Sequence, residues 1–184
     1  MKRAWLILGL LMCVPARAAV SMKDVRIQIE PVVGYEKAFK TIPSPHTNLR
    51  FLYGLRAVAG YSILSGELEA TRASDTESYP ADLRTIAETS EKVKLGLRSS
   101  IDRSFGSAFF RAGGQAQRLT RTDTLVAIAT TVQDPIAIDP YAGLGVELGG
   151  RMIRATGAAT VVFRNLSDWR QNDLETTFGL KIGY

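Results

Sequence analysis

Residues 175–184 read Glu-Thr-Thr-Phe-Gly-Leu-Lys-Ile-Gly-Tyr, and two kinds of residue alternate along this stretch. One set of alternate positions is mostly apolar: Thr176, Phe178, Leu180, Ile182 and Tyr184. The other set is polar or small: Glu175, Thr177, Gly179, Lys181 and Gly183. Because successive side chains of a β-strand point to opposite faces, this pattern predicts a strand with one apolar and one polar face.

The same alternation recurs seven times upstream, in windows about as long as the roughly 10-residue strand of a membrane barrel. The eight predicted strands cover residues 25–35, 49–59, 63–71, 92–101, 108–115, 138–149, 153–163 and 175–184. Tight turns are expected at 60–62, 102–104 and 150–151, and long polar loops at 36–48, 72–89, 117–135 and 164–173. Short turns on one side and long loops on the other are typical of outer-membrane barrels.

The distribution of charge separates a membrane barrel from a soluble β-sandwich or a lipocalin-like barrel, which also have alternating strands. The central parts of the apolar faces carry no charge, as expected for strands facing lipid, where a charge costs about 2–4 kcal/mol. The polar faces carry seven basic and five acidic residues: Arg26, Glu30, Arg56, Glu67, Glu69, Lys94, Arg98, Arg111, Glu147, Arg154, Glu175 and Lys181. We therefore predict an all-β fold, an eight-stranded antiparallel up-and-down transmembrane β-barrel.

Those twelve polar-face charges are predicted to pair inside the barrel, since an unpaired buried charge is costly. Strand glycines at 96, 113, 143, 145, 179 and 183 give long side chains room to cross a narrow lumen. An eight-stranded barrel is just wide enough for side chains to fill it, so we expect a plugged lumen with a structural ion-pair network. The alternative interpretation is a narrow path for ions or small solutes.

The first eighteen residues predict a cleaved signal peptide. Lys2 and Arg3 precede an apolar run at 4–14, and small residues at 16 and 18 precede a cleavage point before Ala19. The run is too short to span a membrane as a helix. The barrel domain is then 19–184. Removing Lys2, Arg3 and Arg17 lowers the formal charge from +5 to +2, so the basic character gives no argument for nucleic-acid binding. The only cysteine, Cys13, lies within the signal.

The last strand resembles a known signal. Phe178, Leu180, Ile182 and Tyr184 are similar to the C-terminal signal of bacterial outer-membrane barrels, although Tyr replaces the commoner terminal Phe. With eight strands, the chain resembles the small-barrel group that includes the OmpA transmembrane domain, OmpX and OmpW. This resemblance implies export to the outer membrane of a Gram-negative-type bacterium and recognition by periplasmic chaperones and the barrel-assembly machinery. The resemblance also implies a monomer surrounded by outer-membrane lipid and lipopolysaccharide.

A catalytic site is only weakly indicated. His46, the only histidine, lies in the first predicted loop, and Ser74 and Asp75 in the next loop are its conceivable partners, as in lipid A-modifying barrels. A solvated loop histidine is the favoured interpretation, because the surrounding motif does not match those enzymes. Asp134 and Asp139 are too few for a calcium loop. No cofactor or metal is expected.

The predicted function is that of a non-enzymatic integral outer-membrane protein, contributing to envelope integrity or to surface interactions through its loops. The alternatives are an outer-leaflet lipid A-modifying enzyme and a narrow pore. Basic residues in the predicted loops fit either lipopolysaccharide phosphates or plain solvated charge: Lys37, Lys40, Arg72, Arg84, Arg118 and Arg121.

Overall fold

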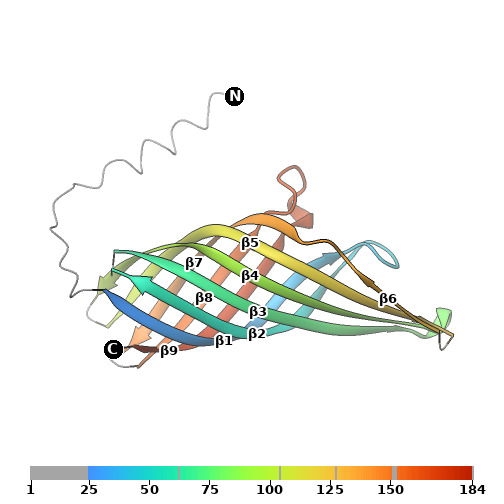
Figure 1. Cartoon of the computed structure of the whole chain (residues 1–184), viewed down its shortest axis with the longest axis horizontal. Helices are drawn as coiled ribbons and strands as arrows, with labels where there is room; N and C mark the ends of the chain where they lie inside the picture. Colours follow the sequence, from blue (N-terminus) through green and yellow to red (C-terminus); the bar gives the residue numbers. More distant parts are fainter. Residues whose placement is uncertain (1–24, 62, 104, 127, 151–152, 184) are drawn as a thin grey trace.

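A computed structural model describes residues 25–61, 63–103, 105–126, 128–150 and 153–183, and nearly all of them lie in β-strands (Figure 1). The strands are β1 (Arg26–Lys40), β2 (His46–Gly60), β3 (Leu64–Tyr79), β4 (Arg84–Arg103), β5 (Gly106–Leu125), β6 (Ile128–Gln133), β7 (Ala137–Gly149), β8 (Ile153–Val162) and β9 (Asp173–Gly183). Two 3₁₀ turns complete the chain, η2 (Pro80–Asp82) and η3 (Trp169–Gln171). Within the described residues, no helix is long and apolar enough to cross a membrane.

The strands close into a barrel of eight positions. Neighbouring strands pair antiparallel in the order β4-β3-β2-β1-β9-β8-β7-β5, and pairing of β4 with β5 closes the circle. The ninth strand, β6, adds no position because it pairs with the outer part of β5, in line with β7. The predicted eight-stranded antiparallel barrel is therefore confirmed. The predicted signal peptide at 1–18 lies outside the described residues.

A β-bulge joins β6 to β7. Gln117 of β5 lies opposite Ala137, and Thr120 lies opposite Gln133. Three steps along β5 thus face four steps along the other strand, which places one extra residue in the segment 134–136. Bulges of this kind bend a strand and interrupt its pairing. In this barrel the bulge marks the point where the chain leaves the closed barrel for its extension.

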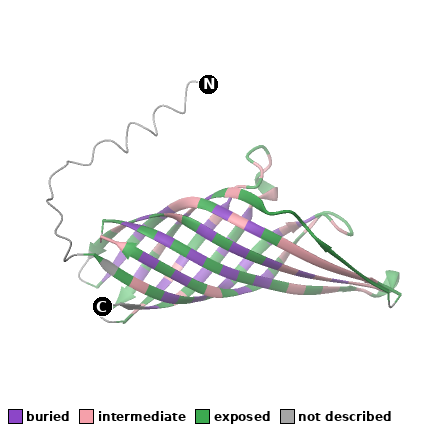
Figure 2. Ribbon diagram, in the orientation of Figure 1, coloured by how far each residue is buried: buried purple, intermediate pink, exposed green. Residues whose placement is uncertain are grey.

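Burial alternates along the strands in the inverted sense expected of a membrane protein, with polar residues inside (Figure 2). Leu97 and Val146 face outward with exposed fractions of 60% and 51%, whereas Arg98 and Glu147 are 1% exposed. Polar residues in the interior and apolar residues on the exterior are the arrangement of a barrel surrounded by lipid. Aromatic side chains gather at one rim of this exterior, where Tyr35 contacts Phe51 edge-on and Phe51 stacks with Tyr53.

A row of charged side chains marks where the apolar exterior ends. Arg72, Glu91 and Arg118 lie side by side on three adjacent strands, next to Tyr53, and all three are exposed on the outer face. Below the row the outward positions include Leu68, Ala70, Val93 and Leu95; above it they are mainly Ser, Thr and Ala. For a barrel set in a membrane, this row is where water would replace lipid around the wall.

The long loops predicted at 72–89 and 117–135 are wrong. β3 and β4 stay paired from Leu64–Ser99 out to Tyr79–Arg84, and β5 continues to Leu125, where it turns back into β6. β4 and β5 have 20 residues each, about twice the 9–11 residues that a spanning strand needs. The outer halves of β3, β4 and β5, together with β6, form a four-stranded sheet that projects beyond the barrel (Figure 1). It is called the extracellular sheet after the placement proposed below.

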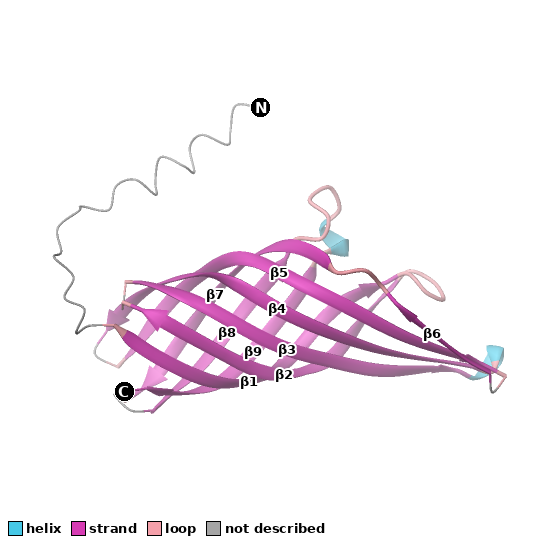
Figure 3. Cartoon of the chain, viewed as in Figure 1, coloured by secondary structure: helices cyan, strands magenta, loops and turns pink. Residues whose placement is uncertain are grey.

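The first predicted loop is shorter than expected, whereas the last keeps its predicted length of ten residues and starts one residue earlier. Residues 36–40 continue β1 and residues 46–48 begin β2, so only 41–45 connect these strands. Between β8 and β9, residues 163–172 form a compact loop that contains η3 and stands away from the barrel wall (Figure 3). Phe163, predicted at a strand end, lies in this loop with its ring 6.3 Å from that of Trp169.

Candidate functional site

The barrel interior is the most charged part of the molecule. Sixteen charged side chains among the described residues are buried, eight acidic and eight basic. The acidic group is Glu30, Glu36, Glu67, Glu69, Glu88, Glu147, Asp173 and Glu175, and the basic group is Lys40, Arg50, Arg56, Lys92, Lys94, Arg98, Arg111 and Lys181. Equal numbers allow the interior to be neutral overall, which limits the cost of burying so many charges.

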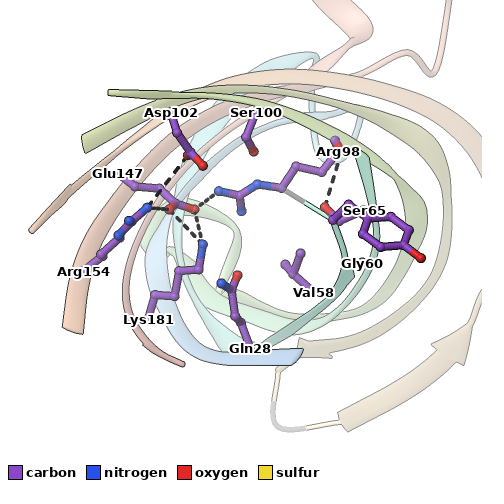
Figure 4. Close-up of a pocket in the computed structure, with 11 residues that line it drawn as sticks. Gln28, Val58, Gly60, Ser65, Arg98, Ser100, Asp102, Glu147, Arg154 and Lys181 are labelled. Carbon is purple, nitrogen blue, oxygen red and sulfur yellow. Dashed lines mark hydrogen bonds and ion pairs between the residues drawn. The ribbon is translucent and has the colours of Figure 1, made fainter. Parts of the chain in front are cut away.

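At the end of the barrel where β1 begins and β9 ends, Glu147 is the centre of a cluster (Figure 4). Lys181 donates to both of its carboxylate oxygens at 2.7 and 2.8 Å, and Arg98 donates to one of them. Arg154 donates to the other oxygen at 3.3 Å. The Arg98 guanidinium also lies 3.5 Å above the ring of Phe109, in a cation–π contact. A hollow of only about 30 Å³ remains at this end, room for little more than a water molecule.

The middle of the barrel is crossed by a second cluster around Glu67 and Glu69. Arg111 donates to both carboxylates at 2.7 Å, one contact each. Arg56 and Lys94 donate to Glu69 at 2.6 and 2.7 Å. Arg56 also reaches Glu30 on β1 at 3.2 Å. These contacts join opposite walls of the barrel, because β1, β2, β3, β4 and β5 all contribute a charged side chain.

Two further clusters continue the network outward. Lys92 pairs with Glu175 at 2.8 Å and also with Glu36, which Arg50 approaches at 3.4 Å. At the base of the extracellular sheet, Lys40 pairs with three acids: Asp75, Glu77 and Glu88. Arg121 donates to Glu88 at 2.7 Å, and Arg84 pairs with Asp123 further out. The ion pairs therefore form a nearly continuous column from one end of the interior to the other.

The structure places ten of the twelve residues predicted for the interior in buried, paired positions: Glu30, Arg56, Glu67, Glu69, Lys94, Arg98, Arg111, Glu147, Glu175 and Lys181. Arg154 lies at the rim with its side chain 23% exposed. Arg26 begins β1, but its side chain lies outside the described part of the structure.

Six interior charges were not among the residues predicted for the interior: Glu36, Lys40, Arg50, Glu88, Lys92 and Asp173. Four of them fell in segments predicted as loops. Arg50 and Lys92 lay inside predicted strands. Each is an even number of residues from an interior charge of the same strand, Arg56 or Lys94, so the two-residue period of a strand already assigned it to the inner face. Counting every charge on the inner face as far as the strand ends could have identified them.

Glycines make room for neighbouring interior side chains, for example at positions 145 and 179. A Cβ atom at Gly179 would meet the Glu30 carboxylate, and one at Gly145 would meet the Phe109 ring. Each glycine lies on a strand next to the one that carries this side chain, at a point where the two strands come close together. Glycine in a strand weakens it, so its presence at such positions is explained by the space that a neighbouring side chain takes.

His46 does not form the predicted arrangement with Ser74 and Asp75. Its Nε2 lies 3.2 Å from Glu77, and its Nδ1 lies 2.7 Å from the Ser44 carbonyl oxygen. Asp75 instead accepts a hydrogen bond from Asn48 and pairs with Lys40. Ser74 is exposed on the opposite face of β3 from Asp75, because adjacent residues of a strand point to opposite faces. The structure thus does not bring the three predicted partners together.

Electrostatics around His46 are set by the outer end of the sheet. The Ser44 carbonyl, and then Glu77, raise the pKa of His46 above its usual value. Burial raises the pKa of Glu77, but hydrogen bonds from Tyr79 and His46 outweigh this effect and lower it. The Tyr79 hydroxyl donates to Glu77 at 2.6 Å, and this bond raises the pKa of Tyr79 to about 12. The arrangement favours the protonated form of the imidazole beside this carboxylate.

The six basic residues of the predicted loops divide into two groups. Lys40, Arg84 and Arg121 point to the inner face of the sheet and are paired with acids. Lys37, Arg72 and Arg118 face outward and are exposed. Within the described residues, no group of His, Cys, Asp and Glu is arranged to hold a metal ion.

Comparison with known proteins agrees with this geometry. No protein-family model and no curated protein matches the chain. Among solved structures, Neisserial surface protein A (NspA) superposes with a TM-score of 0.63 at 9% identity, over 88% of this chain and 97% of that one. The chain has the fold of the small eight-stranded outer-membrane β-barrels. Ail of Yersinia pestis gives 0.55 at 11% identity over 88% and 98% of the two chains. The N-terminal barrel of Pseudomonas aeruginosa OprF gives 0.53 at 11% over 86% and 97%.

At this level of identity the similarity describes the fold and not the function. The C-terminal residues lie as a barrel of this fold requires: Phe178 and Leu180 on β9 face outward with exposed fractions of 55% and 46%. The side chain of Ile182 and all of Tyr184 lie outside the described residues, so recognition by the assembly machinery stays a prediction.

Proposed function

We propose that this chain is a non-enzymatic integral outer-membrane protein that anchors a rigid extracellular sheet and presents it to another protein. The apolar exterior below the row of Arg72, Glu91 and Arg118 supports the placement in a membrane. The free edge of β6 is the observation that supports presentation of the sheet to another protein. An enzymatic role has no comparable support, since His46, Ser74 and Asp75 do not converge.

The barrel serves as a closed anchor in this proposal. Clusters around Glu147, Glu69 and Glu36 cross the lumen at successive levels, and their members are 0–3% exposed apart from Lys181 at 9% and the rim residue Arg154. Ions would have to displace paired side chains to pass. The reconstituted protein should therefore be silent in a planar bilayer, whereas removal of the middle cluster by Glu69→Ala, Lys94→Ala and Arg111→Ala together should produce conductance. Steady conductance of the unmodified protein would contradict a closed anchor.

The extracellular sheet ends in an unpaired strand. β6 pairs with β5 on one side, and among the described residues no strand pairs with it on the other. β8 joins β7 only from Tyr141 onward. The Asp134 amide donates to the Leu119 carbonyl at 2.8 Å. Because bonded residues alternate in an antiparallel pair, the free edge then exposes the N–H groups of Ala129, Thr131 and Gln133.

The sequence of β6 does not protect this edge. Edge strands are usually blunted by charges, prolines or bulges. β6 reads Ile-Ala-Thr-Thr-Val-Gln, with all six residues exposed and no charge or proline among them. Protection begins only at the bulge, which contains Pro135. An edge of this kind accepts an extended peptide as one more strand, with main-chain hydrogen bonds giving affinity. The partner that fits is thus an extended, largely uncharged segment of another protein.

A polyanionic ligand is a poorer fit for this sheet. One structure of Ail is a complex with the heparin analogue sucrose octasulfate. In the present chain the basic residues on the inner face of the sheet, Lys40, Arg84 and Arg121, are already paired with acids. A polysulfate would compete with those acids, so the sheet favours a peptide over a sulfated saccharide.

The test uses a synthetic peptide that copies residues 119–125 of β5, the strand that already pairs with β6. Calorimetry should detect binding to the detergent-solubilised barrel. Thr131→Pro removes one edge N–H that β5 does not use and should abolish binding. Thr131→Val keeps the N–H and should bind as the unmodified protein does. Equal binding by both variants, or absence of binding to the unmodified barrel, would refute the edge as the site.

A further inference from the structure

A second site lies on the outside of the barrel, between its wall and the compact loop 163–172. It is a cavity of about 450 Å³, within the usual range of small-molecule sites. Lys37 and Phe39 project from β1, Val161 and Leu174 form an apolar floor, and Trp169 and Arg170 of η3 line the cavity from the loop. His46, Thr47, Asn172 and Asp173 complete the lining.

The loop that covers this cavity is internally fixed. Asp168 accepts a hydrogen bond from the Arg170 amide at 3.0 Å and another from the Gln171 side chain at 3.0 Å. The Asn172 side chain accepts from the Asn165 amide at 3.0 Å. These bonds hold the aromatic ring and the guanidinium of η3 in place without any contribution from a ligand. A site that is ordered in advance loses less entropy on binding.

The chemistry of the lining is specific. Lys37 and Arg170 are exposed, and neither makes an ion pair within the described part of the chain. The one acid of the lining, Asp173, is fully buried and paired with Arg164 at 2.6 Å. Two free cations recognise a carboxylate or a phosphate. Trp169, 67% exposed, offers a flat amphipathic surface beside them. Together they match a sugar ring that carries an anionic group.

We infer that this cavity binds an acidic sugar residue in the headgroup of an outer-leaflet glycolipid. The inference rests on the proposed membrane placement. Lys37 lies two residues, about 7 Å, beyond Tyr35 of the aromatic rim. Val161 and Leu174 continue the lipid-facing exterior upward into the cavity. A glycolipid anchored beside the barrel would therefore present its first sugars at the height of the cavity. A soluble saccharide has no anchor that would concentrate it at this height.

Trp169 provides the readout. The chain has two tryptophans, and Trp5 lies in the predicted signal peptide, so Trp5→Phe leaves Trp169 as the only one whether or not that segment is cleaved. This variant is reconstituted into phosphatidylcholine vesicles, and insertion is checked by heat-modifiable gel mobility, which tests membrane placement independently. Rough-type lipopolysaccharide, whose inner sugars are acidic, should shift the Trp169 emission in a saturable way. Phosphatidylglycerol, an anionic lipid without sugar, should not. An equal response to both lipids would mean that Trp169 only senses an anionic interface, which overturns the site.

Variants distinguish the site from general attraction. Lys37→Gln and Arg170→Gln, each in the Trp5→Phe background, should weaken the glycolipid response about tenfold, the usual consequence of losing one charge-assisted contact. Arg118→Gln, an exposed arginine on another part of the wall, is the matched control and should change nothing. The inference fails if Arg118→Gln weakens the response as much, or if a soluble acidic sugar such as glucuronate gives the full response at the same concentration. Failure with normal insertion leaves the proposed membrane anchor intact.

Discussion

Replacement of Arg111 by Met tests how much the interior network stabilises the barrel. Arg111 is fully buried and donates to Glu67 and Glu69 at 2.7 Å each. Glu69 keeps Arg56 and Lys94 after the change. Glu67 keeps only Arg56 and Arg98, both at 3.9 Å. One buried carboxylate is thus left nearly uncompensated, and we expect Arg111→Met to lower the free energy of unfolding by about 3–5 kcal/mol.

The assay is urea unfolding of the protein in phosphatidylcholine vesicles, followed by the fraction that retains the heat-modifiable mobility. Adding Glu67→Gln to Arg111→Met removes the stranded charge and should recover at least about 2 kcal/mol, because the cost belongs to the unpaired carboxylate. Arg118→Met, an exposed arginine, is the control and should change the stability by less than about 0.5 kcal/mol. If Arg111→Met costs no more than Arg118→Met, or if Glu67→Gln brings no recovery, the ion pairs are not what holds the strands together.

Three further outcomes follow from the same geometry. Leu95→Arg places a charge in the lipid-facing band and should destabilise the folded barrel by about 2–4 kcal/mol, whereas Thr85→Arg, on the same face of β4 beyond the band, should have little effect; urea unfolding in vesicles compares them. The pKa of His46 is raised, so its protonated form and the contribution of its contact with Glu77 persist below pH 6.5 and fade as the pH rises through the folded-state pKa; nuclear magnetic resonance titration should show a lower midpoint in Glu77→Gln. Deletion of Tyr184 should reduce assembly into the outer membrane, measured as the heat-modifiable fraction in cells.

Strands within the membrane could be predicted from sequence because lipid imposes a strict rule on them. In the pairs Leu97–Arg98 and Val146–Glu147, the residue that faces lipid must be apolar, and its neighbour on the inner face is free to be polar. The alternation is therefore visible in the sequence itself. The polar face could not be assigned to pairs in the same way. Which carboxylate meets Arg111 depends on strand register and on the stagger around the barrel, and neither leaves a local pattern.

The strand segments beyond the membrane were not predicted, because the rule that lipid imposes does not apply to them. Residues 72–79 and 84–89 face water on their outer side and carry charges on their inner side, so no apolar face is required and no period-2 signal appears. Ladder hydrogen bonds and cross-strand pairs, such as Arg121 with Glu88, stabilise them instead. Their Ser, Thr and Asp content is that of a loop.

The same reasoning explains why the free edge of β6 was invisible in the sequence although its strand is rich in β-branched residues. A period-2 test asks for an apolar face, and β6 has Ile128 and Val132 on one face and Ala129 and Thr131 on the other, a weak contrast. Its identity as an edge depends on β8 ending at Val162, opposite Tyr141, so that no strand is left to pair with residues 128–133. The residue at which β8 ends therefore decides whether the backbone groups of β6 are exposed. If β8 were extended by a designed strand that pairs with β6, the barrel should remain folded while binding of the 119–125 peptide disappears, and persistence of that binding would locate the interaction elsewhere.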